Sequence, residues 1–220
     1  MTRVAGIAVF DLDHTLVRCD SFLCYLLGFL VRHPWRIMRC LHLPVVIAKF
    51  SIGVVNNAKL KEAFLHAVMG GVRQPDIAAW NRVFLERLVR RGLRREGLVT
   101  LEAHRQAGDT LILLTASPDC YVSELGHRLG FDEVICTQVE WREGRLSGRL
   151  RSPNMRGEEK VRAIQDIRCR HDTRPITAYA DHQSDLAMLR VVDRGVLVNG
   201  DHRTQAHAMR QQIQCVVWRD

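Results

Sequence analysis

The sequence has no cysteine pair with C-x-x-C spacing, and its cysteine usage indicates neither a disulfide-rich protein nor a zinc ribbon. The seven cysteines are odd in number, and none shows the C-x-x-C spacing of a zinc ribbon. We therefore expect reduced thiols in a cytoplasmic protein rather than a disulfide framework. The apolar stretch within residues 1–13 is too short for a signal peptide, which fits the same expectation.

Acidic residues are scarce relative to basic ones. The 220 residues include 32 Lys and Arg against 24 Asp and Glu, which gives a net charge of +8. This imbalance indicates an anionic partner, which can be a nucleic acid, a phosphorylated substrate or an anionic membrane surface. No helix-turn-helix, RNA-recognition signature or zinc module accompanies the charge, so we expect no nucleic-acid partner.

Short apolar runs alternate with helical patterns along most of the chain. The runs cover residues 4–10, 110–114, 176–180 and 195–198, and the helical patterns cover residues 97–107, 119–129, 158–170 and 183–192. This alternation predicts an α/β fold with a Rossmann-like parallel sheet. Residues 134–151 break the rhythm and predict an antiparallel hairpin flap. We expect residues 1–16 and 96–220 to form the core, and residues 17–95, which lack a clear strand, to form a helical cap.

Polar residues follow three of the predicted strands, at the sheet edge where parallel α/β proteins bind ligands. They are Asp11, Asp13, Thr115, Ala116, Asp181 and Asp185, and Lys160 opens the helix before the third of these strands. Carboxylates gathered within a few ångströms repel one another, and a hard cation such as Mg²⁺ accepts oxygen ligands of this kind. Mg²⁺ and Lys160 together would neutralise a phosphate group that approaches the acids. The sequence therefore predicts a Mg²⁺-dependent phosphoryl-transfer site.

Asp11 and Asp13 are spaced for two different roles in that reaction. Side chains at positions i and i+2 point the same way from a strand. One carboxylate can act as a nucleophile and form an aspartyl-phosphate. The other can protonate the leaving alkoxide and later deprotonate the attacking water. Thr115 can offer a hydroxyl and a backbone N–H to a phosphate oxygen.

Four motifs make the chain similar to the haloacid dehalogenase (HAD) superfamily. FDLDHTL resembles motif I with the D-x-D-x-T pattern of the phosphatases, LLTASP motif II, GEEK motif III and AYADHQSDLAML motif IV. They occur in the order of the family between residues 7 and 190. The resemblance implies that Asp11 is the nucleophile and Asp13 the general acid/base.

The same resemblance implies the ligand-binding roles of the remaining residues. Thr115, Ala116 and Lys160 would bind the phosphate. Asp11, the main-chain carbonyl of Asp13, Asp181 and Asp185 would bind Mg²⁺.

The position of the helical insert resembles that of the C1-cap subfamily IB, which includes the phosphoserine phosphatases. Ser117-Pro118 stands where those enzymes tend to show Ser-Gly-Gly, and Asp20 stands in place of a cap Glu that reads the substrate amine. Both departures argue against phosphoserine as the substrate. The opening of the cap, DSFLCYLL over residues 20–27, is similar to that of the bacterial phosphatidylglycerophosphatase of the C class.

The segment from Ser21 to Leu60 contains no acidic residue. Its basic residues are Arg32, Arg36, Arg39, Lys49 and Lys59. Its apolar runs, residues 22–31 and 41–55, are shorter than the roughly 20 residues that a membrane span requires. Such runs beside basic residues suit peripheral contact with an anionic membrane, here the inner face of the cell membrane. The alternative is that cap helices pack on each other and on the sheet.

Three functional hypotheses remain open at this point. The first is a Mg²⁺-dependent phosphomonoester hydrolase acting on a lipid or amphiphilic phosphate. The second is the same chemistry on a small soluble phosphate such as phosphoserine. The third is a non-enzymatic basic binding protein, which the presence of both Asp11 and Asp13 argues against. Asp20, Arg36 and Lys61 are candidate substrate-binding residues, Ser117 is predicted to cap the following helix, and the oligomeric state is unknown.

Overall fold

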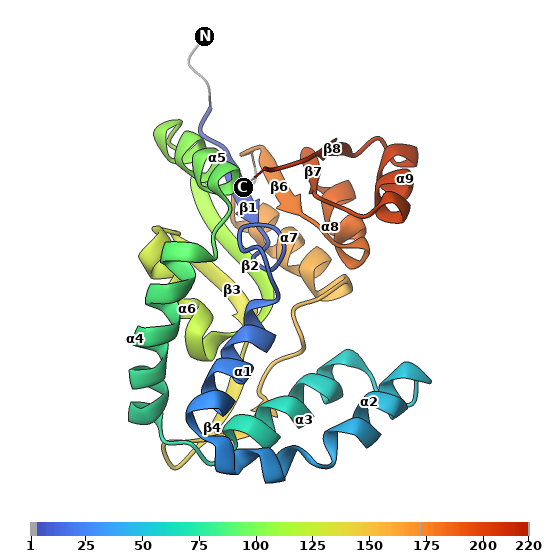
Figure 1. The fold of residues 1–220 in the computed structure, drawn as a ribbon. Coiled ribbons are helices and arrows are strands. Elements are labelled where there is room, and N and C mark those ends of the chain that lie inside the picture. Colours follow the sequence, from blue (N-terminus) through green and yellow to red (C-terminus); the bar gives the residue numbers. More distant parts are fainter. Residues whose placement is uncertain (1–3, 172, 220) are drawn as a thin grey trace.

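Six parallel strands form the central sheet of the computed structural model, which describes residues 4–171 and 173–219 (Figure 1). The strands are β1 (Ile7–Phe10), β2 (Thr110–Pro118), β3 (Glu133–Thr137), β6 (Ile176–Ala180), β7 (Arg194–Val198) and β8 (Gln214–Val216). Their order is β3-β2-β1-β6-β7-β8. All four residues of β1 are buried, which is typical of a parallel strand covered on both faces. The predicted α/β fold is therefore confirmed.

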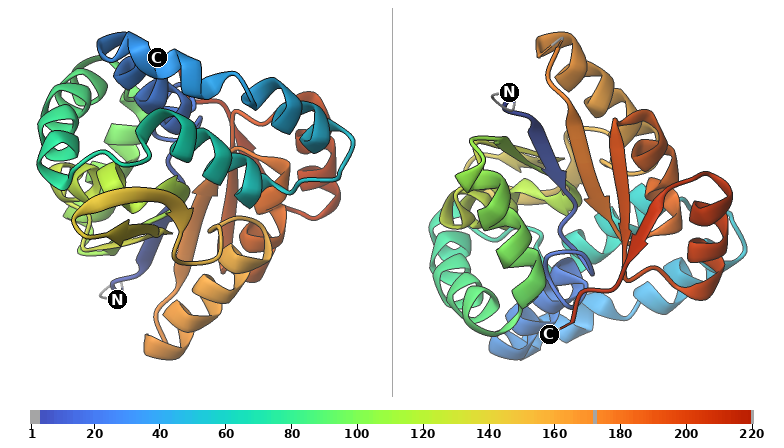
Figure 2. Two further views of the ribbon diagram at one scale, coloured as in Figure 1. Left: turned by 90° about the horizontal axis from the view of Figure 1, so that it is seen from below. Right: turned by 90° about the horizontal axis from the view of Figure 1, so that it is seen from above.

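Helices cover both faces of this sheet (Figure 2, right). They are α5 (Arg95–Gln106), α6 (Asp119–Leu129), α7 (Glu158–Arg170), α8 (Leu186–Val191) and α9 (His202–Arg210). Successive strand residues point to opposite faces. Accordingly, Phe10 belongs to the buried cluster that includes Leu125 of α6, whereas Val9 belongs to the cluster that includes Ile164 of α7. The two apolar layers leave polar residues at the carboxyl ends of the strands.

The chain between β1 and β2 is helical. It forms α1 (Ser21–Arg32), the 3₁₀ helix η1 (Pro34–Cys40), α2 (Leu43–Ser51), α3 (Asn57–Met69) and α4 (Gln74–Arg91). Seen from below, α1, α2 and α3 extend across the carboxyl edge of the sheet (Figure 2, left). In contrast, α4 packs beside α6, where the Asn81 side-chain amide donates to the Cys120 carbonyl at 2.7 Å. Among the described residues, no helix has both the length and the apolar character needed to cross a membrane.

The segment predicted to be a hairpin divides into two parts. Residues 133–137 form β3, an edge strand of the main sheet that pairs in parallel with β2, and Val134 of this strand packs against α6 at Gly126. The hairpin itself consists of β4 (Val139–Arg142) and β5 (Arg145–Leu150). It therefore begins later than residue 134. The segments α9 and β8 were also absent from the sequence prediction.

The hairpin packs tightly against α3. A Cβ atom built on Gly148 would lie 2.4 Å from the Cα atom of His66, and the φ of Gly148 is +84°. Glycine accommodates both this close approach and the left-handed backbone. The Leu150 N–H also donates to the Glu62 carboxylate at 3.0 Å. The hairpin and α3 are therefore held together at two points.

Candidate active site

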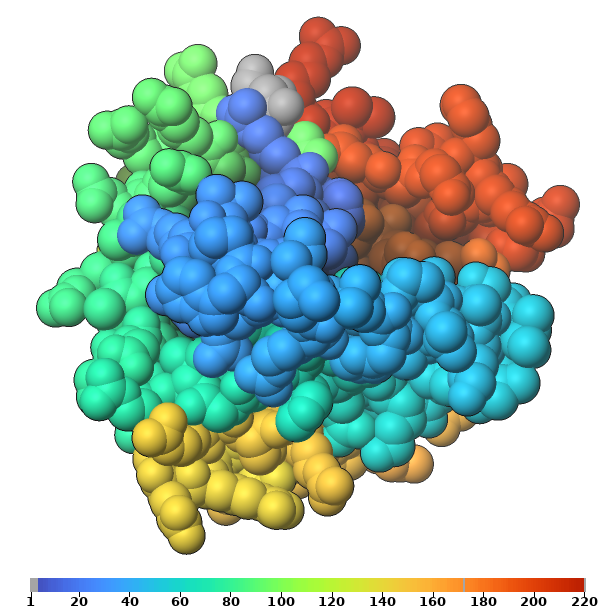
Figure 3. All heavy atoms as spheres, turned by 60° about the horizontal axis from the view of Figure 1, so that its bottom comes forward, coloured from blue at the N-terminus to red at the C-terminus, as the bar shows by residue number. Residues whose placement is uncertain are grey.

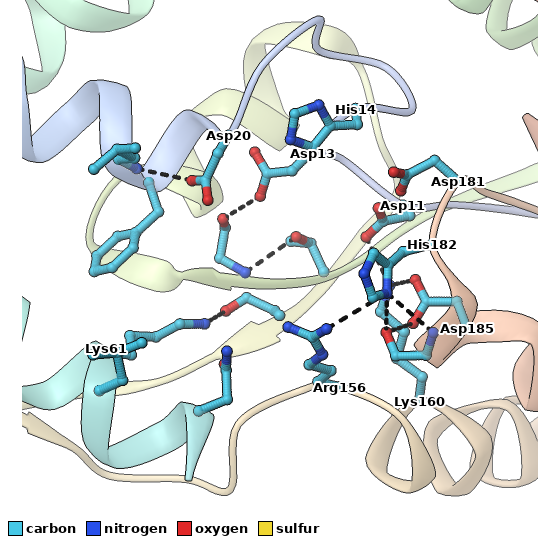
Figure 4. Close-up of a pocket in the computed structure, with 18 of the residues that line it drawn as sticks. Asp11, Asp13, His14, Asp20, Lys61, Arg156, Lys160, Asp181, His182 and Asp185 are labelled. Atoms are coloured by element: carbon cyan, nitrogen blue, oxygen red, sulfur yellow. Dashed lines mark hydrogen bonds and ion pairs between the residues drawn. The ribbon is translucent and has the colours of Figure 1, made fainter. Parts of the chain in front are cut away.

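A cavity of about 380 Å³ lies between the carboxyl ends of β1, β2 and β6 and the helices α1 and α3 (Figure 4). Its lining includes every residue of the predicted core site, namely Asp11, Asp13, Thr115, Ala116, Lys160, Asp181 and Asp185. They come from three strand ends and one helix start because parallel strands bring their carboxyl ends to the same edge. The topology thus brings together residues that are up to 174 positions apart, from Asp11 to Asp185.

Lys160 lies between two carboxylates at the floor of this cavity. Its Nζ donates to Asp11 Oδ1 and to Asp185 Oδ2, each at 2.7 Å, and only 2% of its side chain is exposed. Burial by itself would lower the pKa of Lys160, but the charges of Asp11 and Asp185 outweigh burial and raise that pKa above its ordinary value. Lys160 is therefore a fixed positive charge next to Asp11. Gly157, at φ +60°, makes the turn that starts its helix.

The acids around Lys160 remain crowded. Burial, together with the smaller effect of the Asp185 charge, raises the pKa of Asp11 to about 7, although the charge of Lys160 opposes that rise. Burial and the charges of Asp11 and Asp185 raise the pKa of Asp181 to about 8. The Thr15 hydroxyl lies 3.4 Å from carboxylate oxygens of both Asp11 and Asp181. One ammonium group thus does not balance the acids at neutral pH, and the site favours a further cation.

Asp13 has a different environment from Asp11. It accepts the Ser21 N–H at 2.7 Å through Oδ1 and the Ser117 hydroxyl at 2.6 Å through Oδ2. Burial raises the pKa of Asp13 above its ordinary value, although both hydrogen bonds oppose that rise. Ser117 was expected to cap the next helix, but Pro118 occupies the N-cap position of α6. That prediction was wrong because the bond from Ser117 to Asp13 joins two strand ends, a contact that local sequence does not reveal.

The donor chemistry of this cluster fits Mg²⁺. Asp11, Asp181 and Asp185 supply hard carboxylate oxygens, and the loop at Asp13 supplies backbone carbonyls. Within residues 4–171 and 173–219, no group of three or more His, Cys, Asp or Glu side chains is already arranged as a complete metal site. Mg²⁺ usually keeps several waters and binds through one or two carboxylates, so it does not require such a group. Asp185 accepts hydrogen bonds from both Lys160 and Ser184.

Two of the three candidate residues of the cap line the cavity. The Asp20 carboxylate accepts the Leu23 N–H at 2.8 Å and thereby caps α1. The Lys61 ammonium donates to the Ala116 carbonyl, and at 2.7 Å to the side-chain oxygen of Asn154. Burial lowers the pKa of Lys61 to about 8. Lys61 therefore joins α3 to the end of β2 that carries Thr115 and Ala116.

Arg36, the third candidate, lies outside the cavity lining. Its guanidinium donates to the backbone carbonyls of Val68 at 3.0 Å and Gly70 at 3.2 Å, at the carboxyl end of α3. This position argues against a substrate-binding role, because its donors already stabilise the end of a helix.

Sequence reasoning missed several residues that line the cavity. Arg156 lies in the loop before α7, and its guanidinium is 3.5 Å from the ring of His182 (Figure 4). The apolar wall opposite the acids consists of Phe22, Leu23, Leu26, Leu60 and Phe64. An apolar side chain in a predicted helical cap carries no signal of whether it faces a ligand cavity or the core.

The model of the haloacid dehalogenase-like hydrolase family matches residues 8–190. The chain belongs to this family. Protein CicA of Caulobacter vibrioides is 30% identical to it over 188 residues, which cover 85% of this chain and 83% of CicA. The histidinol-phosphatase of Neisseria meningitidis is 24% identical, over 92% of this chain and 94% of its own. The phosphoserine phosphatase SerB1 of Mycobacterium tuberculosis is 26% identical, over 91% and 67%.

A solved structure shares the fold over nearly its full length. A protein of unknown function from Bordetella pertussis Tohama I superposes with a TM-score of 0.82 at 24% identity, covering 97% of this chain and 99% of that one. The predicted HAD resemblance is thus confirmed. With its D-x-D-x-T motif and phosphatases among its relatives, the chain is a HAD-family phosphatase.

Proposed function

We propose that this HAD phosphatase hydrolyses phosphomonoesters with Mg²⁺ through an aspartyl-phosphate formed on Asp11. The observation that carries the proposal is the buried contact of 2.7 Å between Lys160 and Asp11 at the floor of the cavity. This contact orients the Asp11 carboxylate and keeps it next to a fixed positive charge, although burial raises the pKa of Asp11. A nucleophile and a phosphate-neutralising cation are thereby adjacent.

Asp11 and Asp13 would divide the chemistry between them. A carboxylate oxygen of Asp11 forms a bond to phosphorus while the bond from phosphorus to the leaving oxygen breaks, and Asp13 gives its proton to that oxygen. In the second half of the reaction, Asp13 takes a proton from a water molecule. The water oxygen bonds to phosphorus, and the bond between phosphorus and the Asp11 oxygen breaks. The raised pKa of Asp13 suits a group that must hold a proton at the start.

The remaining core residues would bind the ligands. Thr115, the Ala116 N–H and Lys160 hold the phosphoryl oxygens. Asp11, the main-chain carbonyl of Asp13, Asp181 and Asp185 would hold Mg²⁺, which when bound supplies positive charge that neutralises the acids and the phosphoryl group.

The apolar wall favours a leaving group with hydrocarbon character. Phe22, Leu26 and Leu60 line the cavity on the side away from the acids. We propose a lipid or amphiphilic phosphate as the substrate, because burial of hydrocarbon against this wall contributes about 25 cal/mol per Å².

A second candidate is a small soluble phosphate that carries an amine. The Asp20 carboxylate lines the cavity and could pair with an ammonium group. Two relatives, named phosphoserine phosphatase and histidinol-phosphatase, bear names that refer to such substrates.

The chemistry and the substrate are tested separately. Hydrolysis of an aryl phosphate, measured with Mg²⁺ and with EDTA, tests the reaction class, and Asp11→Asn is expected to abolish it while the thermal melt remains cooperative. Unchanged turnover in that variant would refute the nucleophile assignment. A panel of lipid phosphates, phosphoserine and histidinol phosphate, ranked by kcat/KM, then identifies the leaving group.

A further inference from the structure

The cap presents an apolar surface to solvent. We define the cap surface as the exposed side chains of residues 23–54, apolar and basic, from α1, η1, α2 and the turn that follows. Val31 is 81% exposed, Trp35 67% and Ile52 75%. The same part of the chain runs as a continuous blue-to-cyan band across the face in Figure 3. Monomeric proteins rarely expose contiguous apolar patches of this kind unless they bind something.

The burial pattern of α1 shows that its exposed apolar side chains are additional to those that it packs into the core. Tyr25 and Phe29 face the interior and are buried. Leu23, Leu27 and Val31, spaced four residues apart, form an exposed row on the opposite side of the helix. The helix is therefore apolar on two sides, of which the fold covers one.

The helix α2 shows the same feature more strongly. Its sequence, LPVVIAKFS, is apolar almost all round, yet Leu43 is its one buried residue. Val45, Ile47 and Phe50 are exposed. A helix that is apolar all round is normally buried in a protein core or in a membrane.

The charges within this surface are of one sign. No acidic residue occurs between Asp20 and Glu62. Arg36 and Arg39 both donate to the backbone carbonyl of Gly70, so neutral carbonyl groups hold their charges in place. Lys49 is exposed on α2. The cap surface is thus apolar and cationic together.

We propose that the cap surface docks on an anionic membrane, with its apolar side chains in the interface and its basic residues against the lipid phosphates. Charge complementarity decides between a bilayer and a second copy of the chain. A symmetric dimer through this face would bring two sets of cations together, whereas an anionic bilayer neutralises them. Without a membrane-spanning helix among the described residues, the contact is peripheral.

Docking would also place the cavity next to the bilayer. Leu23 both belongs to the exposed row of α1 and lines the cavity. A phosphate carried on a lipid could therefore enter along α1, a step that rests on the proposed function. The docking itself does not depend on catalysis.

Vesicle flotation tests the proposal. The purified protein is mixed at low salt with vesicles of phosphatidylcholine alone or of equal parts phosphatidylcholine and phosphatidylglycerol. We expect binding to the anionic vesicles, weakened by high salt and absent from neutral ones. Ile37→Gln combined with Ile47→Gln should reduce partitioning at least about tenfold, because each change removes an apolar side chain from the interface.

A matched pair of substitutions serves as the control. Val99→Gln with Met209→Gln changes two apolar residues that are 63% exposed each, more than Ile37 at 58% and Ile47 at 43%, but that lie on α5 and α9 of the core. This variant should bind vesicles as the parent does. Both double variants should retain parental hydrolysis of a soluble aryl phosphate, which separates failure of docking from failure of the proposed chemistry.

Three results would overturn docking. The first is a parent protein that does not float with anionic vesicles at low salt. The second is equal loss of binding in the two double variants, or none in either. The third is a dimer in sedimentation velocity that Ile37→Gln with Ile47→Gln abolishes, without vesicle binding by the parent, which would assign the surface to a second copy of the chain.

Discussion

Lys160→Met tests whether the buried ammonium holds the acidic cluster together. Methionine has a similar length and no charge, so the substitution leaves the buried carboxylates of Asp11 and Asp185 without the ammonium group between them. Removing one partner of a buried ion pair costs about 3–5 kcal/mol. We expect a loss of this size in the free energy of unfolding of the metal-free protein, measured by urea denaturation in EDTA.

The pH dependence of that loss gives a sharper test. The pKa of Asp11 is already about 7, above its value in the unfolded chain, and loss of Lys160 raises it further. A carboxyl whose pKa is raised on folding contributes stability at low pH, and that stability is lost as the pH rises through the folded-state pKa. The deficit of Lys160→Met should therefore be larger at pH 8 than at pH 5.

Lys59→Met is the matched control for this experiment. Lys59 forms an ion pair of the same length, 2.7 Å, with Glu62, but its side chain is 70% exposed. Exposed pairs contribute about 0–1 kcal/mol. An equal loss in both variants, or a Lys160→Met deficit that does not change with pH, would refute the role assigned to the buried charge. Turnover should fall at least about 100-fold in Lys160→Met and stay parental in Lys59→Met.

Three further substitutions probe other contacts. Ser117→Ala removes a hydrogen bond that lowers the pKa of Asp13, so the limb of the pH–rate profile that reports Asp13 should move to higher pH. An unmoved profile would mean that this hydrogen bond does not influence the pKa of Asp13. Asp181→Asn should raise the Mg²⁺ concentration needed for half-maximal activity, as a Mg²⁺ titration of aryl phosphate hydrolysis would show; a parental titration would mean that Asp181 is not a ligand. Gly148→Ala should lower stability by about 2 kcal/mol or more in urea denaturation, because the new Cβ would meet the backbone of His66; a change within about 0.5 kcal/mol would contradict the packing.

The sequence predicted the parts of the site that depend on local pattern and parallel topology. Asp11 and Asp181 each follow a short apolar run, and parallel strands must end at a common edge, so the meeting of these two side chains follows from the pattern alone. The helix of Lys160 was expected at its observed bounds, and β1 was expected to end where it does, at Phe10, but it begins at Ile7 rather than at residue 4.

Contacts between segments that are distant in sequence could not be predicted. The bond of Ser117 to Asp13 and the position of Arg36 at the end of α3 depend on how the cap helices sit on the sheet. The strand β3 was assigned to the hairpin because alternation alone does not tell which strand is its partner. The sequence likewise predicted a helical cap over residues 17–95 with apolar runs at 22–31 and 41–55, but it did not show which of these apolar side chains stay exposed.

The contacts that hold α3 in place limit how far this side of the cavity can move when a substrate binds. The Lys61 ammonium ties one part of this helix to the Ala116 carbonyl, and close packing at Gly148 holds another part against the hairpin. A helix anchored at two points behaves as a fixed wall. Selectivity between leaving groups of different bulk should therefore depend on the side chains that line the cavity, such as Phe22 and Leu26 of α1, rather than on movement of α3.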